Sequence, residues 1–348
     1  MSSLGNIHKI CNKISINDDW SFDICGKKII VAPYESHDHW SGKMQNFGSN
    51  KISGSTQKEK FLETLTSMIY QYFYSTGKVE PNIETLEKWG TFTPLPSEQS
   101  HYVHNLSSFN NSHSKPDPMW TVTSVNQESI LAEKNHNLKV LKTGQYHLYD
   151  VNNQLQIGSK IHLIRQNQDY DIQPYFLYVY SNEVMDSNSE LIRFYFNIDP
   201  LYTHTLIDEI TKTGNQYHLP FTFKCLDHPN YYKCRSDAFV LYIDKNHHYL
   251  AWKVILKLYP LIKNHLNDEV PLFSYKIKDG IGFAEDPGNN QSFGLTRSAA
   301  VASLLIEASN DGNQLTNSRI QESFLNRGIL ADKMYLSIDS STSYSFVK

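Results

Sequence analysis

Two short segments, LIRFYFNI (191–198) and FTFKCL (221–226), alternate apolar and polar residues with the period of a β-strand. In the first segment the apolar residues share one face, so Arg193 and Tyr195 share the other. In the second, Lys224 lies on the face opposite the phenylalanines. Both segments therefore predict strands with a core face and a cationic face. If they belong to one sheet, Arg193, Tyr195 and Lys224 would converge on one pocket.

The remaining patterns predict an α+β fold, with an antiparallel or mixed sheet flanked by helices. Turn residues between short alternating segments favour antiparallel pairing. Strands are expected at 120–125, 129–133, 138–142, 160–165, 174–180, 191–198, 220–226, 237–243 and 271–277. Helices are expected at 57–75, 83–89, from Asp199 to about Thr213 with Gly214 as the stop, and at 248–265, 295–309 and 316–327.

A polar stretch from about residue 92 to 118, rich in Ser, Asn, His and Pro, predicts a long surface loop or linker. It suggests a boundary between a mainly helical N-terminal region, 1–115, and an α+β domain, 116–348. Whether residues 1–115 recognise a peptide or only pack against the domain stays open.

The overall charge and the apolar runs exclude several classes of protein. A net charge of −4 and a pI near 6.4 argue against a nucleic-acid binder or an anionic-membrane binder. The N-terminus lacks the apolar run of a secretory signal, and no segment approaches the roughly 20 apolar residues of a membrane span. The four cysteines form no CxxC pair, so no zinc site is expected. These patterns predict a cytoplasmic protein.

The distribution of arginine points to anion recognition. The chain has six arginines, all after residue 164: Arg165, Arg193, Arg235, Arg297, Arg319 and Arg327. Arginine binds anions in a planar, bidentate geometry that lysine does not offer, although uneven codon use would explain the distribution equally well. Asp237 can orient the guanidinium of Arg235, and Tyr231 or Tyr232 would add a hydroxyl.

A second anion-binding feature is expected near Arg297, in the first turn of a helix that follows a glycine-containing loop. Free backbone N–H groups at such a helix start favour an anion. Glu285 and Asp286 oppose this interpretation unless they point away or neutralise a neighbouring cation.

Lys224 has two candidate roles in such a pocket. A phosphate ligand would be charged, whereas a general base must be neutral, and both burial and neighbouring arginines lower a lysine pKa. The alternative is structural: Lys224 would pair with Asp227 or Glu209 on an exposed face.

Several segments together resemble the HopA-type type III effector family. They are DPMWTVTSV (117–125), RFYFNIDP (193–200), LPFTFKCLDHPNYYKCRSDAFVLYI (219–243) and VPLFSYKIKDGIGFAEDPGNNQSFGLTR (270–297). Related sequences lie beside kinases in bacterial peptide natural-product pathways and are taken as lyases. The family is also distantly similar to phosphothreonine lyases and to the lyase domains of class III lanthipeptide synthetases, which implies a phosphothreonine-lyase-like core.

The resemblance implies β-elimination of phosphate without a metal or cofactor. By the PFK…Y..R spacing, Lys224 matches the base and Arg235 a phosphate ligand. Arg193 takes the place of the first lysine of a Lys-x-His pair, which puts Tyr195 where the histidine acid would be. Either Tyr195 is the acid, or His218 serves, or the chemistry has been lost. The expected phosphate-binding residues are Arg193, Arg235, Arg297 and Tyr232.

Three functions follow from these expectations. The first is a phosphoserine/phosphothreonine lyase that acts after a separate kinase on a precursor peptide, giving dehydroalanine or dehydrobutyrine in peptide natural-product biosynthesis. The second is a non-catalytic effector or adaptor that binds a host or partner protein and is secreted into a host cell. The third is a phosphopeptide-binding module.

Overall fold

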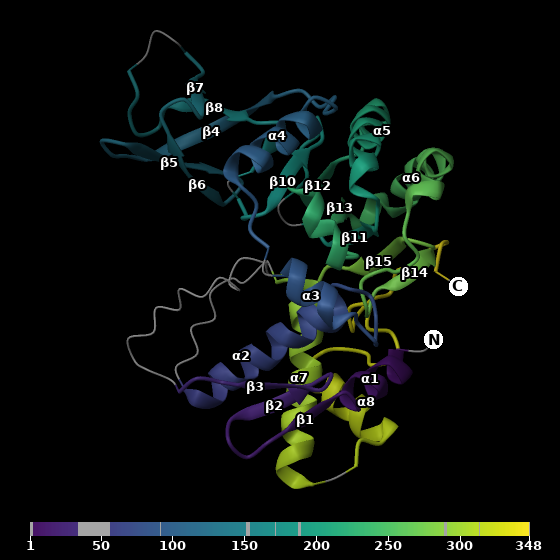
Figure 1. Ribbon diagram of the computed structural model, residues 1–348. Helices are drawn as coiled ribbons and strands as arrows, with labels where there is room; N and C mark the ends of the chain where they lie inside the picture. The colour runs from purple at the N-terminus through teal and green to yellow at the C-terminus, as the bar shows by residue number, and fades with distance from the viewer. Residues whose placement is uncertain are drawn as a thin grey trace.

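The computed structural model describes most of the chain: residues 3–33, 56–90, 92–150, 154–170, 172–186, 189–288, 291–312 and 314–347. Its helices and strands form the predicted α+β fold, with antiparallel sheets and helices beside them (Figure 1). No described helix combines the length and the hydropathy that crossing a bilayer requires.

A seven-stranded antiparallel sheet forms the centre of the molecule, with the strand order β14-β15-β11-β13-β12-β10-β9. Its strands are β9 (Gln168–Asp169), β10 (Phe176–Tyr180), β11 (Leu191–Phe196), β12 (Phe221–Leu226), β13 (Phe239–Asp244), β14 (Tyr275–Lys278) and β15 (Ile281–Glu285). The sequence predicted both β11 and β12, and the structure places them in this same sheet, separated by β13.

The helices α5 (Thr203–Gln216) and α6 (His248–Ile262) cover one face of this sheet. The apolar residues of the alternating strands, such as Phe194, Phe223 and Leu241, are buried beneath them. Gly214 lies inside α5 and does not end it, contrary to the prediction. A Cβ atom at Gly214 would come within 2.7 Å of the Phe221 ring, so the glycine lets the helix approach the sheet closely.

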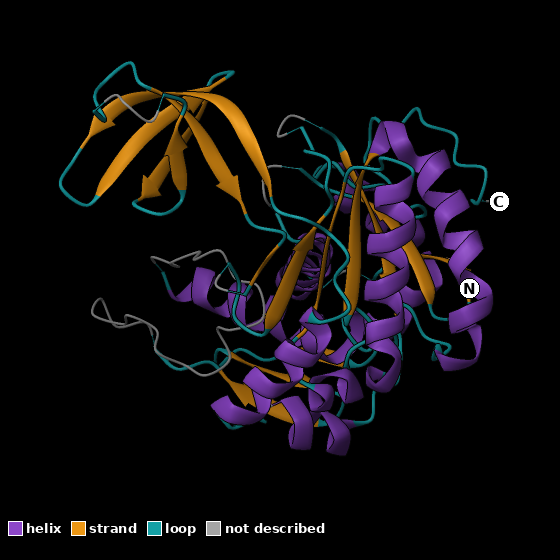
Figure 2. Cartoon of the chain, turned by 90° about the horizontal axis from the view of Figure 1, so that it is seen from above, coloured by secondary structure: helices purple, strands orange, loops and turns teal. Residues whose placement is uncertain are grey.

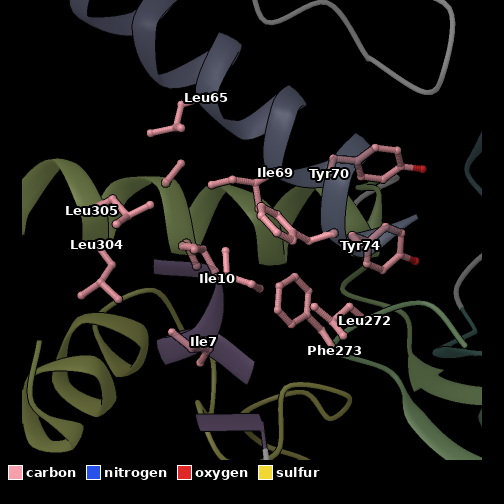
Figure 3. Packing of buried hydrophobic residues seen from close by; sticks show 14 of the residues in the cluster. Ile7, Ile10, Leu65, Ile69, Tyr70, Tyr74, Leu272, Phe273, Leu304 and Leu305 are labelled. Atoms are coloured by element: carbon pink, nitrogen blue, oxygen red, sulfur yellow. The ribbon is translucent and has the colours of Figure 1, made fainter. Parts of the chain in front are cut away.

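The other face of the sheet packs against α2 (Gln57–Ile69), a π-helical turn (Tyr70–Tyr74) and α7 (Phe293–Asp311). Figure 3 shows Leu65 and Ile69 on the side of α7 that faces α2, and Leu304 pointing to the opposite side of α7; all three belong to one buried core. The same core includes residues of α1 (Ser3–Cys11), β1 (Ile14–Ile16), β2 (Ser21–Ile24) and α8 (Asn317–Leu325), and Ile29 of β3 (Lys27–Ile30) packs against it.

A separate five-stranded antiparallel sheet with its own small core lies to one side of the central sheet (Figure 2). Its order is β6-β5-β4-β8-β7, with β4 (Lys115–Val125), β5 (Ser129–Lys134), β6 (Asn137–Lys142), β7 (Tyr146–Leu148) and β8 (Lys160–Arg165). Trp120, Ile130 and Ile161 are buried between these strands.

The polar stretch expected to be a loop contains α4 (Pro96–Ser107), which follows α3 (Ile83–Gly90). Pro96 occupies the first turn, and the Glu98 carboxylate accepts a hydrogen bond from the backbone N–H of Leu95 at 3.2 Å. Leu106 is buried in the core beneath α5 and α6. These local caps and the buried Leu106 stabilise a helix that the polar composition of the segment did not indicate.

The chain does not divide into two packing units at residue 115. Residues of α1 and α2 share one core with Tyr195 and Val240 of the central sheet. The described part of the N-terminal region contains the short three-stranded sheet β1-β2-β3 beside its helices.

Candidate functional site

The register of the central sheet brings Lys224 and Tyr195 onto one face. Lys224 of β12 is the partner of Val240 in β13, and Val240 is the partner of Tyr195 in β11. One row away, Arg193 is the partner of Tyr242. Partners in antiparallel strands point to the same side, so all these side chains lie on the face that packs against α2 and α7. We call this the cationic face.

Lys224 is partly buried and lies among aromatic rings at the β10 side of this face. Its Nζ donates to the side-chain oxygen of Gln173 at 2.9 Å and lies 4.3 Å from the centre of the Phe176 ring. Burial, and after it the charge of Arg193, lower the pKa of Lys224 from 10.5 to about 7, whereas Asp237 opposes the change. Near neutral pH the amine is therefore present in both its charged and its neutral form.

The alternative interpretation, in which Lys224 forms an ion pair on an exposed face, does not match this environment. Gln173 is an uncharged partner, and Asp227 accepts a hydrogen bond from Gln99. Lys224 therefore has a polar neighbour that stabilises its charge only weakly.

Arg235 is held by a bidentate pair with Asp237, as the sequence suggested. Its Nε donates to Asp237 Oδ1 at 2.8 Å and its Nη2 to Oδ2 at 2.7 Å, and Nη2 also donates to the Tyr70 hydroxyl at 2.8 Å. Arg235 and Asp237 are 7% and 5% exposed. Such a pair is fixed in geometry as well as in charge.

Arg193 is held in a similar way by the loop after β15. Its Nε donates to Asp286 Oδ2 at 2.7 Å and its Nη2 to the backbone oxygen of Gln291 at 3.0 Å. Asp286 therefore neutralises a neighbouring cation, which is the condition that the sequence left open.

The two Arg–Asp pairs change how the cationic face can bind an anion. Each guanidinium already has a carboxylate partner, and exchanging a buried partner for an external phosphate would be costly. The phosphate-binding role expected for Arg193 and Arg235 stays a prediction, and both guanidinium groups lower the pKa of Lys224. Protonated Lys224 can attract an anion, and neutral Lys224 can accept a proton.

Tyr195 lies deep in the cationic face, where it is 1% exposed. Its hydroxyl accepts a hydrogen bond from the Tyr74 hydroxyl at 3.2 Å. Burial raises the pKa of Tyr195. The hydroxyl is thus buried against Tyr74, and the role of Tyr195 as the acid stays a prediction.

His218 and Tyr232 do not join this group, contrary to the expectation. His218 follows the end of α5, is exposed, and its Nδ1 lies 3.0 Å from Glu183 Oε1. Tyr232 is buried on the opposite side of the sheet, and its hydroxyl donates to the backbone oxygen of Leu226 at 3.2 Å. Neither side chain points to the cationic face. His218 follows a helix end and Tyr232 lies in a 3₁₀ turn, so the alternation of the strand does not extend to either residue.

The guanidinium of Arg297 also donates hydrogen bonds within the protein, to two backbone oxygens. From α7 its Nε donates to the backbone oxygen of Met334 at 2.8 Å and its Nη2 to that of Leu336 at 3.2 Å. Burial lowers its pKa to about 10. Arg297 thus anchors the C-terminal segment beside the cationic face.

Sequence reasoning missed three residues of the site: Gln173, Tyr178 and Tyr242. Tyr242 could have been found, because alternation in FVLYID (239–244) puts it on the face opposite Phe239 and Leu241. The ring of Tyr242 lies 5.2 Å from the guanidinium carbon of Arg193. Gln173 lies before β10 in no periodic pattern, so no local signal marks it.

The segment that contains this site also matches a known family. Residues 167–336 match the model of the HopA1 effector protein family. This segment is similar to that family, and we call it the HopA1-family segment. The HopA1-family segment contains all seven residues predicted from the sequence for the site, and the resemblance to HopA-type effectors is confirmed.

Two solved structures are similar to the chain in outline. One is the effector protein from Pseudomonas syringae pv. tomato strain DC3000, with 14% identity, a TM-score of 0.43, and coverage of 73% of this chain and 95% of that one. The other is the effector protein from Pseudomonas syringae pv. syringae strain 61, with 16% identity, a TM-score of 0.42, and coverage of 79% and 98%. A comparison with the curated proteins found no match.

Proposed function

We propose that the chain is an effector protein that binds a partner protein at the β10 side of its cationic face, where Lys224 is only partly buried and would contact an anionic group such as a phosphorylated side chain. The observation that carries the proposal is a partly buried lysine that titrates near pH 7 beside Arg193, within the HopA1-family segment. The similarity to a family of effector proteins supports a role in binding a protein of another cell after secretion.

The two Arg–Asp pairs give this contact its selectivity. Because Asp237 and Asp286 already balance the arginines, the charge that an anion would meet is that of Lys224. An anion that approaches Lys224 favours its protonated form and so gains a charge-assisted hydrogen bond. Binding by this route is strongest where the amine is protonated.

The pKa of Lys224 also favours a second candidate, a phosphoserine/phosphothreonine lyase. A general base must be neutral at the working pH, and Lys224 meets that condition above pH 7. In this reaction the amine takes the α-proton of the phosphorylated residue, the Cβ–O bond breaks, and phosphate leaves. The product is dehydroalanine or dehydrobutyrine. A separate kinase would supply the phosphorylated precursor peptide.

The two candidates predict opposite pH dependences, which one series of measurements separates. Calorimetry with a sulfated peptide, whose charge is constant between pH 6 and 9, should show affinity falling as pH rises through about 7. Mass spectrometry of a phosphopeptide should show loss of phosphoric acid, at a rate that rises through the same pH, only if Lys224 acts as a base.

Two variants of Lys224 sharpen this prediction. Lys224→Ala should lower peptide affinity by about tenfold or more, because a charge-assisted hydrogen bond is lost. Lys224→Arg should retain binding and remove its pH dependence, and it should abolish any elimination, since guanidinium cannot accept the proton. Lys276→Ala is the matched control, because Lys276 is exposed and pairs with Asp279. A wild-type protein that binds no anionic peptide at any pH would contradict the effector proposal in this form.

A further inference from the structure

The α2 region ends in a π-helical turn, Tyr70–Tyr74, that lies over the cationic face. Such turns are rare and occur often at functional sites. The rings of Tyr70 and Tyr74 lie side by side, with centroids 5.0 Å apart, and their hydroxyls point the same way (Figure 3). Both residues lie outside the HopA1-family segment.

Tyr70 makes contact with both members of one Arg–Asp pair. Its hydroxyl accepts from Arg235 Nη2 at 2.8 Å and donates to Asp237 Oδ2 at 3.0 Å. The three side chains form a closed, buried network, in which removal of one member leaves another without its partner.

Two further contacts fix the position of the Tyr70 ring. A Cβ atom at Gly294, in the first turn of α7, would lie 2.6 Å from the Tyr70 ring and 2.2 Å from that of Tyr74, so the rings rest directly on the helix backbone. Ser236, between Arg235 and Asp237, donates through Oγ to the backbone oxygen of Ser75 at 2.8 Å. The turn is thus in contact with α7 on one side and attached on the other to the segment that carries Arg235.

We propose that Tyr70 is a positioning residue of the Lys224 site: by holding the Arg235–Asp237 pair in place from the N-terminal helix, it sets the proton affinity and anion affinity of Lys224. The proposal rests on the proposed function for the anion affinity alone. Arg235 and Lys224 lie beside the same ring, because the guanidinium carbon and Lys224 Nζ are 5.9 Å and 4.3 Å from the centre of Phe176. The charged groups that act on Lys224 are Arg193, Arg235, Asp237 and Asp286. Among them, Asp237 acts more strongly than Arg235 and in the opposite direction. A small displacement of this pair therefore changes the balance at Lys224.

The test compares two tyrosines of the same turn. Tyr70→Phe keeps the ring and removes the hydroxyl bonded to Asp237, whereas Tyr72→Phe removes a hydroxyl that lies near Lys27 and Glu87. The titration midpoint of Lys224 is read in the free protein, from the pH dependence of its acetylation by an amine reagent followed by peptide mass spectrometry. The affinity for a sulfated peptide is measured separately, and near-ultraviolet circular dichroism checks the fold.

We expect Tyr70→Phe to raise the midpoint of Lys224 by about half a unit or more, because the Asp237 carboxylate loses a donor and attracts the ammonium more strongly. Peptide affinity above pH 7 should rise by up to about threefold, because a larger fraction of the amine is then protonated. Tyr72→Phe should match the wild type in both. Gly294→Ala, which displaces both rings, should shift the midpoint in the same direction.

The outcomes separate this proposal from the proposed function. If the midpoint shifts in Tyr70→Phe while the wild type binds no anionic peptide, positioning by Tyr70 stands and the function is wrong. If the wild type binds through Lys224 but Tyr70→Phe and Tyr72→Phe behave alike in both measurements, Tyr70 has only a structural role and the inference is overturned.

Discussion

Replacing Lys224 with methionine should stabilise the folded protein by about 2–3 kcal/mol at pH 6, because the buried amine costs free energy while it is protonated. The folded-state pKa of Lys224, about 7, lies below its usual value of 10.5. Below pH 7 the folded and unfolded chains both carry this proton, so the full penalty applies. Between pH 7 and 10.5 the unfolded chain binds more protons, so the stability of the wild type rises with pH and the advantage of methionine disappears.

Urea unfolding of both proteins at pH 6 and pH 10 measures this difference. Lys276→Met is the control, because Lys276 is exposed and its loss should change stability by no more than about 0.5 kcal/mol at either pH. A Lys224→Met protein that is less stable than the wild type at pH 6 would show that Lys224 contributes to folding and is not kept for function.

Asp237→Asn should destabilise the protein by about 3–5 kcal/mol, because it leaves the buried guanidinium of Arg235 without a charged partner. The amide cannot replace both carboxylate oxygens that accept from Nε and Nη2. The same change removes a charge that raises the pKa of Lys224, so this pKa should fall below 7. Thermal and urea unfolding measure the first effect.

The matched variant for this experiment is Asp279→Asn. Asp279 is exposed and pairs with Lys276 at 2.7 Å, and such surface pairs contribute about 0–1 kcal/mol. Equal stability losses in Asp237→Asn and Asp279→Asn would mean that the Arg235–Asp237 pair is not a buried structural unit.

The part of the site that lies in periodic strands could be predicted from the sequence. Alternation is local, so it fixed the face of Arg193, Tyr195 and Lys224 without knowledge of the rest of the fold. Asp237 was predictable as a partner for the same reason, since it lies two residues from Arg235.

The remaining features depend on contacts between distant segments. The Asp286 carboxylate meets Arg193 only because β15 pairs with β11, and β15 was not among the predicted strands. Tyr70 reaches Arg235 across 165 positions of the chain. The amphipathic pattern of α2 predicts a helix that packs, but it does not predict the π-helical turn that aims two hydroxyls at the sheet.

The central claim is that Lys224 is a lysine with a pKa near 7 on the cationic face. Nuclear magnetic resonance of lysine-labelled protein, with the Lys224 signal assigned by its absence from Lys224→Met, measures this pKa directly. We expect a titration midpoint near pH 7, below the usual 10.5. A midpoint near 10.5 would contradict both the anion-binding function proposed for Lys224 and its candidacy as a base.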